Sequence, residues 1–421
     1  MRHPLPRLVC FFSAIVAGAP LAAAAPNATT AWQLPPGWTE TRGGADGKVL
    51  RVSTLAANGP GSLGAALATA GARVIEFAVA GAIDLGGKSL SVSRPFLTIA
   101  GETAPSPGIT LVNGGMNIGT HDVIIRHIRI RPGAGQRAKK SGWEVDGLST
   151  VGGAHDVIVD HCSMTWSTDE NLSASGPRFD GATPDEWRKG TSHRITFSHC
   201  IIAEGLHDST HAKGPHSMGS LIHDNASDIA IIGNLYLSNN ARNPLFKGGA
   251  RGAIVNNLIQ NPGTRVVTYG LVPQEWEGHP WLRGAMVVVG NVARKGPSTI
   301  ATELAFVESR GPCDVYLQDN LYSGADGKSL PATANLRDVK GQPPGGDPND
   351  IPRLVEAPPF WPTRLTARPA AETAAWVLAN AGARPWERDG IDRRLIEEAR
   401  TGAGKIIHFE SEVGGHVAAG R

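Results

Sequence analysis

The stretch His155-Asp-Val-Ile-Val-Asp-His-Cys162 decides the fold, because close copies of it occur on either side. The preceding copy is His121-Asp-Val-Ile-Ile-Arg-His-Ile128, and the following copy is His193-Arg-Ile-Thr-Phe-Ser-His-Cys200. The frame continues at 227–234, 250–257, 284–291 and 313–320. Recurrence of one short pattern along a chain is typical of a protein whose repeats stack on one another.

Each frame has the pattern of a short β-strand that ends in a turn, since apolar and polar residues alternate and then stop at Gly, Asn or Pro. Parallel stacking of the frames, about 4.7 to 4.9 Å apart, would bury a continuous interior. We therefore expect an all-β solenoid, a parallel β-helix. A ladder of side-chain amides is expected at one turn, from Asn234, Asn257, Asn291 and Asn320. Helical repeats fit poorly, because runs such as 285–289 are too short and too β-branched.

Composition excludes several other classes of protein. The 52 Gly and 30 Pro among 421 residues exclude a coiled coil, and the recurrent apolar runs exclude disorder. Of the 40 Lys and Arg residues, Arg2 and Arg7 lie in the acid-free first 25, which leaves 38 basic against 38 acidic residues. A neutral chain without a basic run is unsuited to binding nucleic acid.

The N-terminal residues 1–25 have the pattern of a signal peptide. Two arginines precede an apolar stretch at 8–21, and small residues follow at 22–25. Pro20 interrupts the apolar stretch, which is short for a membrane span. We expect a secreted or periplasmic protein that is not attached to a membrane after cleavage.

The remaining chain divides into a β-helix catalytic domain, 26–340, and a linker and C-terminal tail, 341–421, that packs on the β-helix. An Ala-rich run that begins at Ser62 predicts an N-terminal helix capping the open end of the stack. Stretches 371–381 and 391–401 predict two short helices in the tail.

Cysteine usage gives little information. Once Cys10 leaves with the leader, an odd set of three remains, Cys162, Cys200 and Cys313. Isolated buried thiols are expected, although an oxidising compartment permits a bridge between Cys162 and Cys200.

Acidic residues gather within 30 positions, at Glu144, Asp146, Asp160, Asp169 and Glu170. If neighbouring coils present them on one side, their carboxylates converge into a site for a hard cation such as Ca²⁺, which tolerates irregular ligand sets. The alternative is that these acids lie in solvated loops.

Basic residues form a second group, Lys213, Arg242 and Lys247. Arg242 and Lys247 flank a proline-containing bend, and a forked guanidinium beside an ammonium suits a substrate that carries carboxylates. Solvated surface cations are the alternative.

Three histidines, His207, His211 and His216, raise the possibility of zinc. The first two lie in a loop that contains Gly, Ser and Pro, which is not expected to hold them on one helical face, so the sequence favours no zinc site.

Several motifs resemble bacterial pectate lyases of polysaccharide lyase family 1. These are Asp160-His-Cys-Ser-Met-Thr-Trp-Ser-Thr-Asp-Glu170, Glu204-Gly-Leu with the later Lys213-Gly, and Arg242-Asn-Pro with the downstream Asn256-Asn257. Thr98-Ile-Ala-Gly-Glu-Thr-Ala-Pro105 and Ala381-Gly-Ala-Arg-Pro-Trp386 resemble the secreted subgroup. The resemblance spans roughly 50–400.

This resemblance implies a right-handed parallel β-helix and Ca²⁺-dependent β-elimination of polygalacturonate, which gives 4,5-unsaturated oligogalacturonides. By position, Asp146, with Glu144 two residues before it, matches the first acidic calcium site, and Asp169 matches the second. Asp160 matches a structural Asp-His signature and ranks lower as a ligand. Glu170 is a substitute where the family often has a further Asp and this chain has Ser173.

By the same resemblance, Arg242 matches the arginine taken as the proton abstractor. Lys213 and Lys247 match substrate-binding positions, although an arginine is usual at the position of Lys247. The expected partner is an acidic pectic polysaccharide, and the expected state is a monomer. Two alternatives are a pectin-type hydrolase, which needs carboxylates on both sides of one bond, and a non-catalytic β-helix for carbohydrate binding or adhesion.

Overall fold

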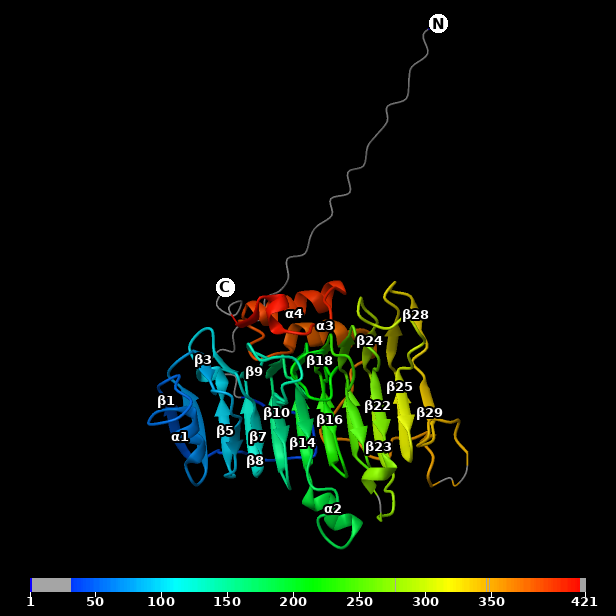
Figure 1. Ribbon diagram of the computed structural model, residues 1–421, viewed down its shortest axis with the longest axis horizontal. Coiled ribbons are helices and arrows are strands. Elements are labelled where there is room, and N and C mark those ends of the chain that lie inside the picture. The colour runs from blue at the N-terminus through cyan, green and yellow to red at the C-terminus, as the bar shows by residue number, and fades with distance from the viewer. Residues whose placement is uncertain (2–31, 277, 346, 348, 417–421) are drawn as a thin grey trace.

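The computed structural model describes residues 1, 32–276, 278–345, 347 and 349–416. Within these residues, three sheets of 11, 10 and 9 strands run along the long axis of the molecule (Figure 1). Each full coil of the chain adds one strand to each sheet, and successive coils pair in parallel. This arrangement confirms the predicted parallel β-helix.

The 11-stranded sheet contains the predicted frames. His121, His155 and His193 begin three successive frames and are aligned across the sheet. The strands, in order, are β1 (Lys48–Val52), β2 (Arg73–Phe77), β5 (Leu97–Ala100), β8 (His121–Arg126), β11 (His155–Asp160), β14 (His193–Ser198), β17 (Ser227–Ile232), β20 (Arg251–Val255), β23 (Gly284–Val289), β26 (Cys313–Gln318) and β30 (Arg353–Leu354).

The other two sheets are built mainly from shorter strands. The 10-stranded sheet has β3 (Gly81–Asp84), β6 (Ile109–Val112), β9 (Arg129–Arg131), β12 (Ser163–Thr165), β15 (Ile201–Ala203), β18 (Leu235–Leu237), β21 (Leu258–Gln260), β24 (Val292–Arg294), β27 (Leu321–Ser323) and β28 (Ser329–Leu330). The nine-stranded sheet has β4 (Leu90–Val92), β7 (Met116–Ile118), β10 (Leu148–Thr150), β13 (Leu172–Ala174), β16 (Leu221–Ile222), β19 (Leu245–Lys247), β22 (Val267–Gly270), β25 (Val307–Arg310) and β29 (Ala334–Arg337).

Like residues lie above like inside the coil. Val123, Val157, Ile195 and Ile229 are aligned on four successive strands, and all four are fully buried. Burying each such side chain contributes about 1.5 to 3 kcal/mol. The stack of apolar rows therefore supplies a core that no single coil could form.

The predicted asparagine ladder is confirmed at the corner between the 11- and 10-stranded sheets. The side-chain amide of Asn234 donates to the Oδ1 atom of Asn257 at 3.0 Å, Asn257 donates to Asn291 at 2.9 Å, and Asn291 donates to Asn320 at 3.0 Å. Each of these amides also bonds to backbone atoms, so the ladder fixes the register of successive coils.

Helix α1 lies at one end of the coil, α3 and α4 lie along one side, and α2 lies on the opposite side (Figure 1). Helix α1 begins after Ser62, whose side chain accepts the N–H of Ala65, so the predicted N-cap is confirmed. The predicted tail helices are α3 and α4, and a capped helix, α2, occupies the loop between β13 and β14. The helical segments are α1 (Leu63–Ala68), α2 (Pro184–Gly190), α3 (Ala370–Asn380), α4 (Gly390–Thr401), η1 (Gly101–Thr103), η2 (Pro273–Trp276) and η3 (Glu410–Val413).

The tail packs on the 10-stranded sheet. Apolar residues of α3 and α4 share a buried cluster with β15, β18 and β21. Beneath it, the fully buried Arg131 guanidinium donates to Asp389 and Asp392, each at 2.7 Å. A buried charge needs such partners, so this pairing ties the tail to β9.

Two further expectations concern the ends of the chain and its thiols. The signal peptide expected at 1–25 lies, apart from residue 1, outside the described residues. Cys162, Cys200 and Cys313 are free and buried, and burial raises the pKa of the Cys162 thiol to about 12. In the described ranges, no helix has the length and hydrophobicity to span a membrane.

Candidate active site

Three of the predicted acidic residues meet at the corner where the chain enters the nine-stranded sheet. Asp146 lies just before β10, and Asp169 and Glu170 lie just before β13 on the next coil. The N–H of Glu170 donates to Asp146 Oδ1 at 3.0 Å, and the N–H of Gly147 donates to the Glu170 carbonyl at 2.9 Å. These bonds hold one carboxylate oxygen from each acid within 4.8 Å of the others.

In the acidic cluster of Asp146, Asp169 and Glu170, the pKa values of the two aspartates shift in opposite directions. Burial and the neighbouring Asp169 carboxylate raise the pKa of Asp146 to about 7. Burial acts in the same direction on Asp169, but the hydrogen bond from His216 and the charges nearby hold its pKa below the ordinary value. Two carboxylates that resist joint ionisation in this way could hold a cation, because a bound cation would relieve their repulsion.

Arg242 enters this corner two coils further along. Isolated parallel bridges align Glu170 with Met218 and Met218 with Ala241, so the three segments stack. Arg242 adopts a φ of 60°, which is unusual for a residue with a side chain, and its carbonyl accepts the N–H of Ser220 at 2.6 Å. Gly219 allows this approach, because a Cβ atom there would lie 2.4 Å from that carbonyl oxygen.

The Arg242 guanidinium forms an ion pair with the Glu170 carboxylate, through Nη1 and Oε1. Burial lowers the pKa of Arg242, while the charges of Asp169 and Asp146 oppose that shift. About a quarter of the side chain, 24%, is exposed. A partly accessible guanidinium therefore adjoins the acidic cluster, which is the arrangement on which the sequence-based hypothesis depends.

Glu144 faces a different partner from the other acids. Its Oε1 atom accepts the N–H of Ala212 at 2.9 Å and lies 3.5 Å from Nδ1 of His211. The chain from His211 to His216 turns back at Gly214, so the two imidazole rings stack with centroids 3.6 Å apart. Burial, with His216 beside it, lowers the pKa of His211.

Both stacked histidines face Asp169. His216 Nε2 lies 3.0 Å from Asp169 Oδ1, and His211 Nε2 lies 3.7 Å from the same oxygen. As expected, His207 and His211 do not share a helical face, but the loop brings together His211 and His216, a pair that the sequence did not predict. His207 instead lies near His408, with ring centroids 5.8 Å apart.

Of the two predicted lysines, Lys213 lies, like Arg242, in a segment that leads from the 10-stranded into the nine-stranded sheet, and Lys247 ends the strand that follows Arg242. Lys213 is exposed, in the loop between β15 and β16, and its N–H donates to Nδ1 of His211 at 3.1 Å. Lys247 ends β19 and forms an ion pair with Glu275. Glu275 also accepts from Arg178 at 2.7 Å, so a network rather than solvent surrounds the Lys247 ammonium.

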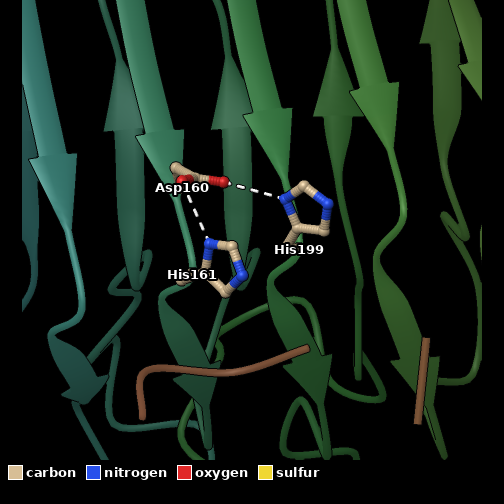
Figure 2. A group of neighbouring side chains, drawn as sticks. All are labelled: Asp160, His161 and His199. Carbon is tan, nitrogen blue, oxygen red and sulfur yellow. Dashed lines mark hydrogen bonds and ion pairs between the residues drawn. The ribbon is translucent and has the colours of Figure 1, made fainter. Parts of the chain in front are cut away.

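Asp160 is not part of the acidic cluster. It ends β11 at the corner with the asparagine ladder, and Figure 2 shows its carboxylate beside the rings of His161 and His199. The Trp32 indole and the Ser198 hydroxyl also donate to it, at 3.0 and 2.7 Å. Despite burial, hydrogen bonds and charge from His161 and His199 hold its pKa well below the ordinary value. The structure thus separates Asp160 from the other predicted ligands.

Curated relatives decide the family. A protein named probable pectate lyase C, from Emericella nidulans, is 30% identical over 376 residues, which cover 89% of this chain and 76% of that protein. A protein of the same name from Aspergillus terreus is also 30% identical over 376 residues, with coverage of 89% and 78%. The chain belongs to the pectate lyase family. No protein-family model matches the chain.

Solved structures agree with the fold of this pectate lyase. The major allergen from cedar pollen superposes with a TM-score of 0.52 at 14% identity, over 81% of this chain and 90% of the allergen. A mutant pectate lyase from Bacillus subtilis gives a TM-score of 0.50 at 13% identity, over 83% and 96%. At such low identity, these superpositions establish only that the β-helix fold is shared.

Proposed function

We propose that this protein cleaves pectate by Ca²⁺-dependent β-elimination and releases 4,5-unsaturated oligogalacturonides. The observation that carries the proposal is the ion pair between Arg242 and Glu170, because it joins the guanidinium to the acidic cluster. β-Elimination on a uronate needs both features: a site that holds a cation against the substrate carboxylate, and a base near C5.

The residues that would hold Ca²⁺ are Asp146, Asp169 and Glu170. Their donor set fits a hard cation, since it consists of carboxylate oxygens within 4.8 Å of one another, and the pKa of Asp146, raised to about 7, reflects crowding that a cation relieves. A bound Ca²⁺ would stabilise the negative charge that develops on the uronate carboxylate as the proton leaves C5. Glu144 lies beside this set, at the His211 turn.

Arg242 is the proposed base. Burial already lowers the pKa of its guanidinium, and neutralisation of Asp169, Asp146 and Glu170 by a cation would remove the negative charges that favour the protonated form. The proton passes from C5 to the guanidine, and the C5–H electron pair forms the C4–C5 double bond. The C4–O4 bond breaks with its electron pair leaving on O4 of the departing sugar, which takes up a proton from solvent. Lys213 and Lys247 are the proposed partners of substrate carboxylates, and Lys247 must exchange Glu275 for the substrate.

We further propose that residues 1–25 direct export, that the β-helix of 26–340 is the catalytic domain, and that 341–421 serves to pack on it. The contacts of Arg131 with Asp389 and Asp392 support the last point. A secreted or periplasmic monomer would meet its polymeric substrate outside the cytoplasm.

The experiment is cleavage of polygalacturonate, followed by the ultraviolet absorbance of the unsaturated product. We expect activity that a chelator abolishes and Ca²⁺ restores. New reducing ends without that absorbance would indicate a hydrolase, and binding without products would indicate a non-catalytic module. An Arg242→Lys variant that keeps near-full turnover and an unaltered pH profile would refute Arg242 as the base.

A further inference from the structure

A second set of ligand atoms adjoins the carboxylates. Asp169, His211 and His216 each offer one atom, and these three atoms lie within 4.8 Å of one another. Asp169 belongs to both sets, so the two sites would share one carboxylate. The second set differs in chemistry, because two of its three donors are imidazole nitrogens.

The loop is folded so that both nitrogens point at one oxygen. The Gly214 N–H donates to the His211 carbonyl at 3.0 Å with a φ of 90° at Gly214, and the His216 N–H donates to the His207 carbonyl at 2.7 Å. Both histidine residues are buried, with 2% and 7% of their surface exposed. Two buried rings from a loop, stacked within 14° of parallel, are held by the fold rather than free to rotate in solvent.

We propose that Asp169, His211 and His216 bind a divalent transition-metal ion such as Zn²⁺ or Co²⁺ beside the calcium ligands. Two ligands that are each about 2.1 Å from one metal ion lie roughly 3.0 to 3.5 Å apart. From Asp169 Oδ1, the 3.0 Å separation to His216 Nε2 lies within that range, and the 3.7 Å separation to His211 Nε2 is slightly longer, so binding would draw the His211 ring toward Asp169. Imidazole nitrogen favours this class of metal, whereas Ca²⁺ favours oxygen.

Glu144 supplies an outer partner for the site. Metal-binding histidines usually donate their second N–H to a carboxylate, and Glu144 Oε1 lies 3.5 Å from His211 Nδ1. The Lys213 N–H donates to that Nδ1, which places the ring proton on Nε2. Metal binding at Nε2 would shift this proton to Nδ1, where Glu144 could accept it in a hydrogen bond and the Lys213 N–H would lose its present acceptor.

This inference rests on the proposed function only in sharing Asp169 with the proposed calcium site. The test uses the full-length, chelator-treated protein and titrates it with Co²⁺, followed by visible absorbance and calorimetry. We expect a ligand-field band in the wild-type protein and an affinity that falls at least tenfold in His211→Ala and His216→Ala. The matched control is His121→Ala, which removes an imidazole that lies 2.8 Å from Asp122 outside this site, and should leave Co²⁺ binding unchanged.

X-ray absorption of the Zn²⁺-loaded wild-type protein provides a readout that needs no variant. Scattering from two imidazoles supports the site. Absence of imidazole scattering, or Co²⁺ binding that both variants retain at full affinity, overturns it. Ca²⁺-dependent cleavage is measured in parallel. Cleavage that does not depend on Ca²⁺, together with Co²⁺ binding that depends on the two histidines, would refute the proposed function alone. Ca²⁺-dependent cleavage, together with Co²⁺ binding that both variants retain at full affinity, would refute this inference alone.

Discussion

Replacement of Asp146 by Asn tests the electrostatics of the acidic cluster most sharply. The pKa of Asp146 rises from 3.8 to about 7, which corresponds to about 4 kcal/mol between its two protonation states. Because the side chain is partly exposed, solvent screening reduces the expected contribution to about 2 kcal/mol. Asn preserves the shape and the acceptor for the Glu170 N–H while removing the charge.

The raised pKa of Asp146 decides how the stability difference between wild type and variant changes with pH. The folded pKa lies above the unfolded one, so the folded, ion-free protein holds the proton more tightly, and this group's contribution to stability is lost as the pH rises from about 4 through about 7. At pH 8 with chelator, Asp146→Asn should therefore be about 2 kcal/mol more stable than wild type. At pH 4 the difference should vanish. Added Ca²⁺ should stabilise wild type and have little effect on the variant.

The assay is denaturant-induced unfolding at both pH values, with chelator and with Ca²⁺. Asp326→Asn is the control, since Asp326 pairs with Lys328 on the exposed surface away from the cluster. A variant that is destabilised equally at both pH values, or that Ca²⁺ stabilises as strongly as wild type, would refute this account of the cluster.

Three further predictions concern the network, the tail and the ladder. Glu275→Gln releases Lys247 from its ion pair and leaves the ammonium free to bind a substrate carboxylate. KM for polygalacturonate should therefore fall several-fold with little change in kcat. An unchanged KM would mean that Lys247 does not contact the substrate. Asp389→Ala leaves the buried Arg131 charge short of one partner and should cost about 3 to 5 kcal/mol in unfolding free energy; a cost below about 1 kcal/mol would show that Asp392 suffices. Asn257→Ala interrupts the ladder in its middle and should cost about 1 to 3 kcal/mol by the same measurement, and a neutral effect would contradict its role in fixing register.

The repeating part of the fold could be predicted from sequence because its determinants are local. A frame such as 155–162 carries its own alternation and its own turn, and stacking then follows from the need to cover one face. The amide ladder followed from the same frame, since Asn234 and Asn257 occupy equivalent positions.

The site was predictable only where residues keep a fixed relation to a strand. Asp146 and Asp169 each precede a strand of the nine-stranded sheet by a few residues, so their convergence follows from coil stacking. Asp160 is close to them in sequence and ranks lower as a ligand, and it ends a strand at a different corner. Spacing along the chain does not reveal which corner a residue occupies, because the loops that connect the strands vary in length.

Contacts between the loops that connect the strands could not be predicted at all. The pairing of His211 with His216 depends on a turn at Gly214 with positive φ, and a histidine, glycine and proline pattern alone does not specify that geometry. Similarly, Glu275 reaches Lys247 from the short helical segment η2, in the connection between β22 and β23. Such contacts depend on how each loop folds over the coil, which no periodic pattern encodes.

The central claim is that Arg242 and the acidic cluster form one site. Calorimetric titration of Ca²⁺ into wild type and Arg242→Ala tests it most directly, because removal of a cation that pairs with Glu170 should tighten Ca²⁺ binding by about tenfold while cleavage is lost. Equal Ca²⁺ affinity in the two proteins would contradict the claim, since it would mean that the guanidinium and the bound cation do not share their carboxylates.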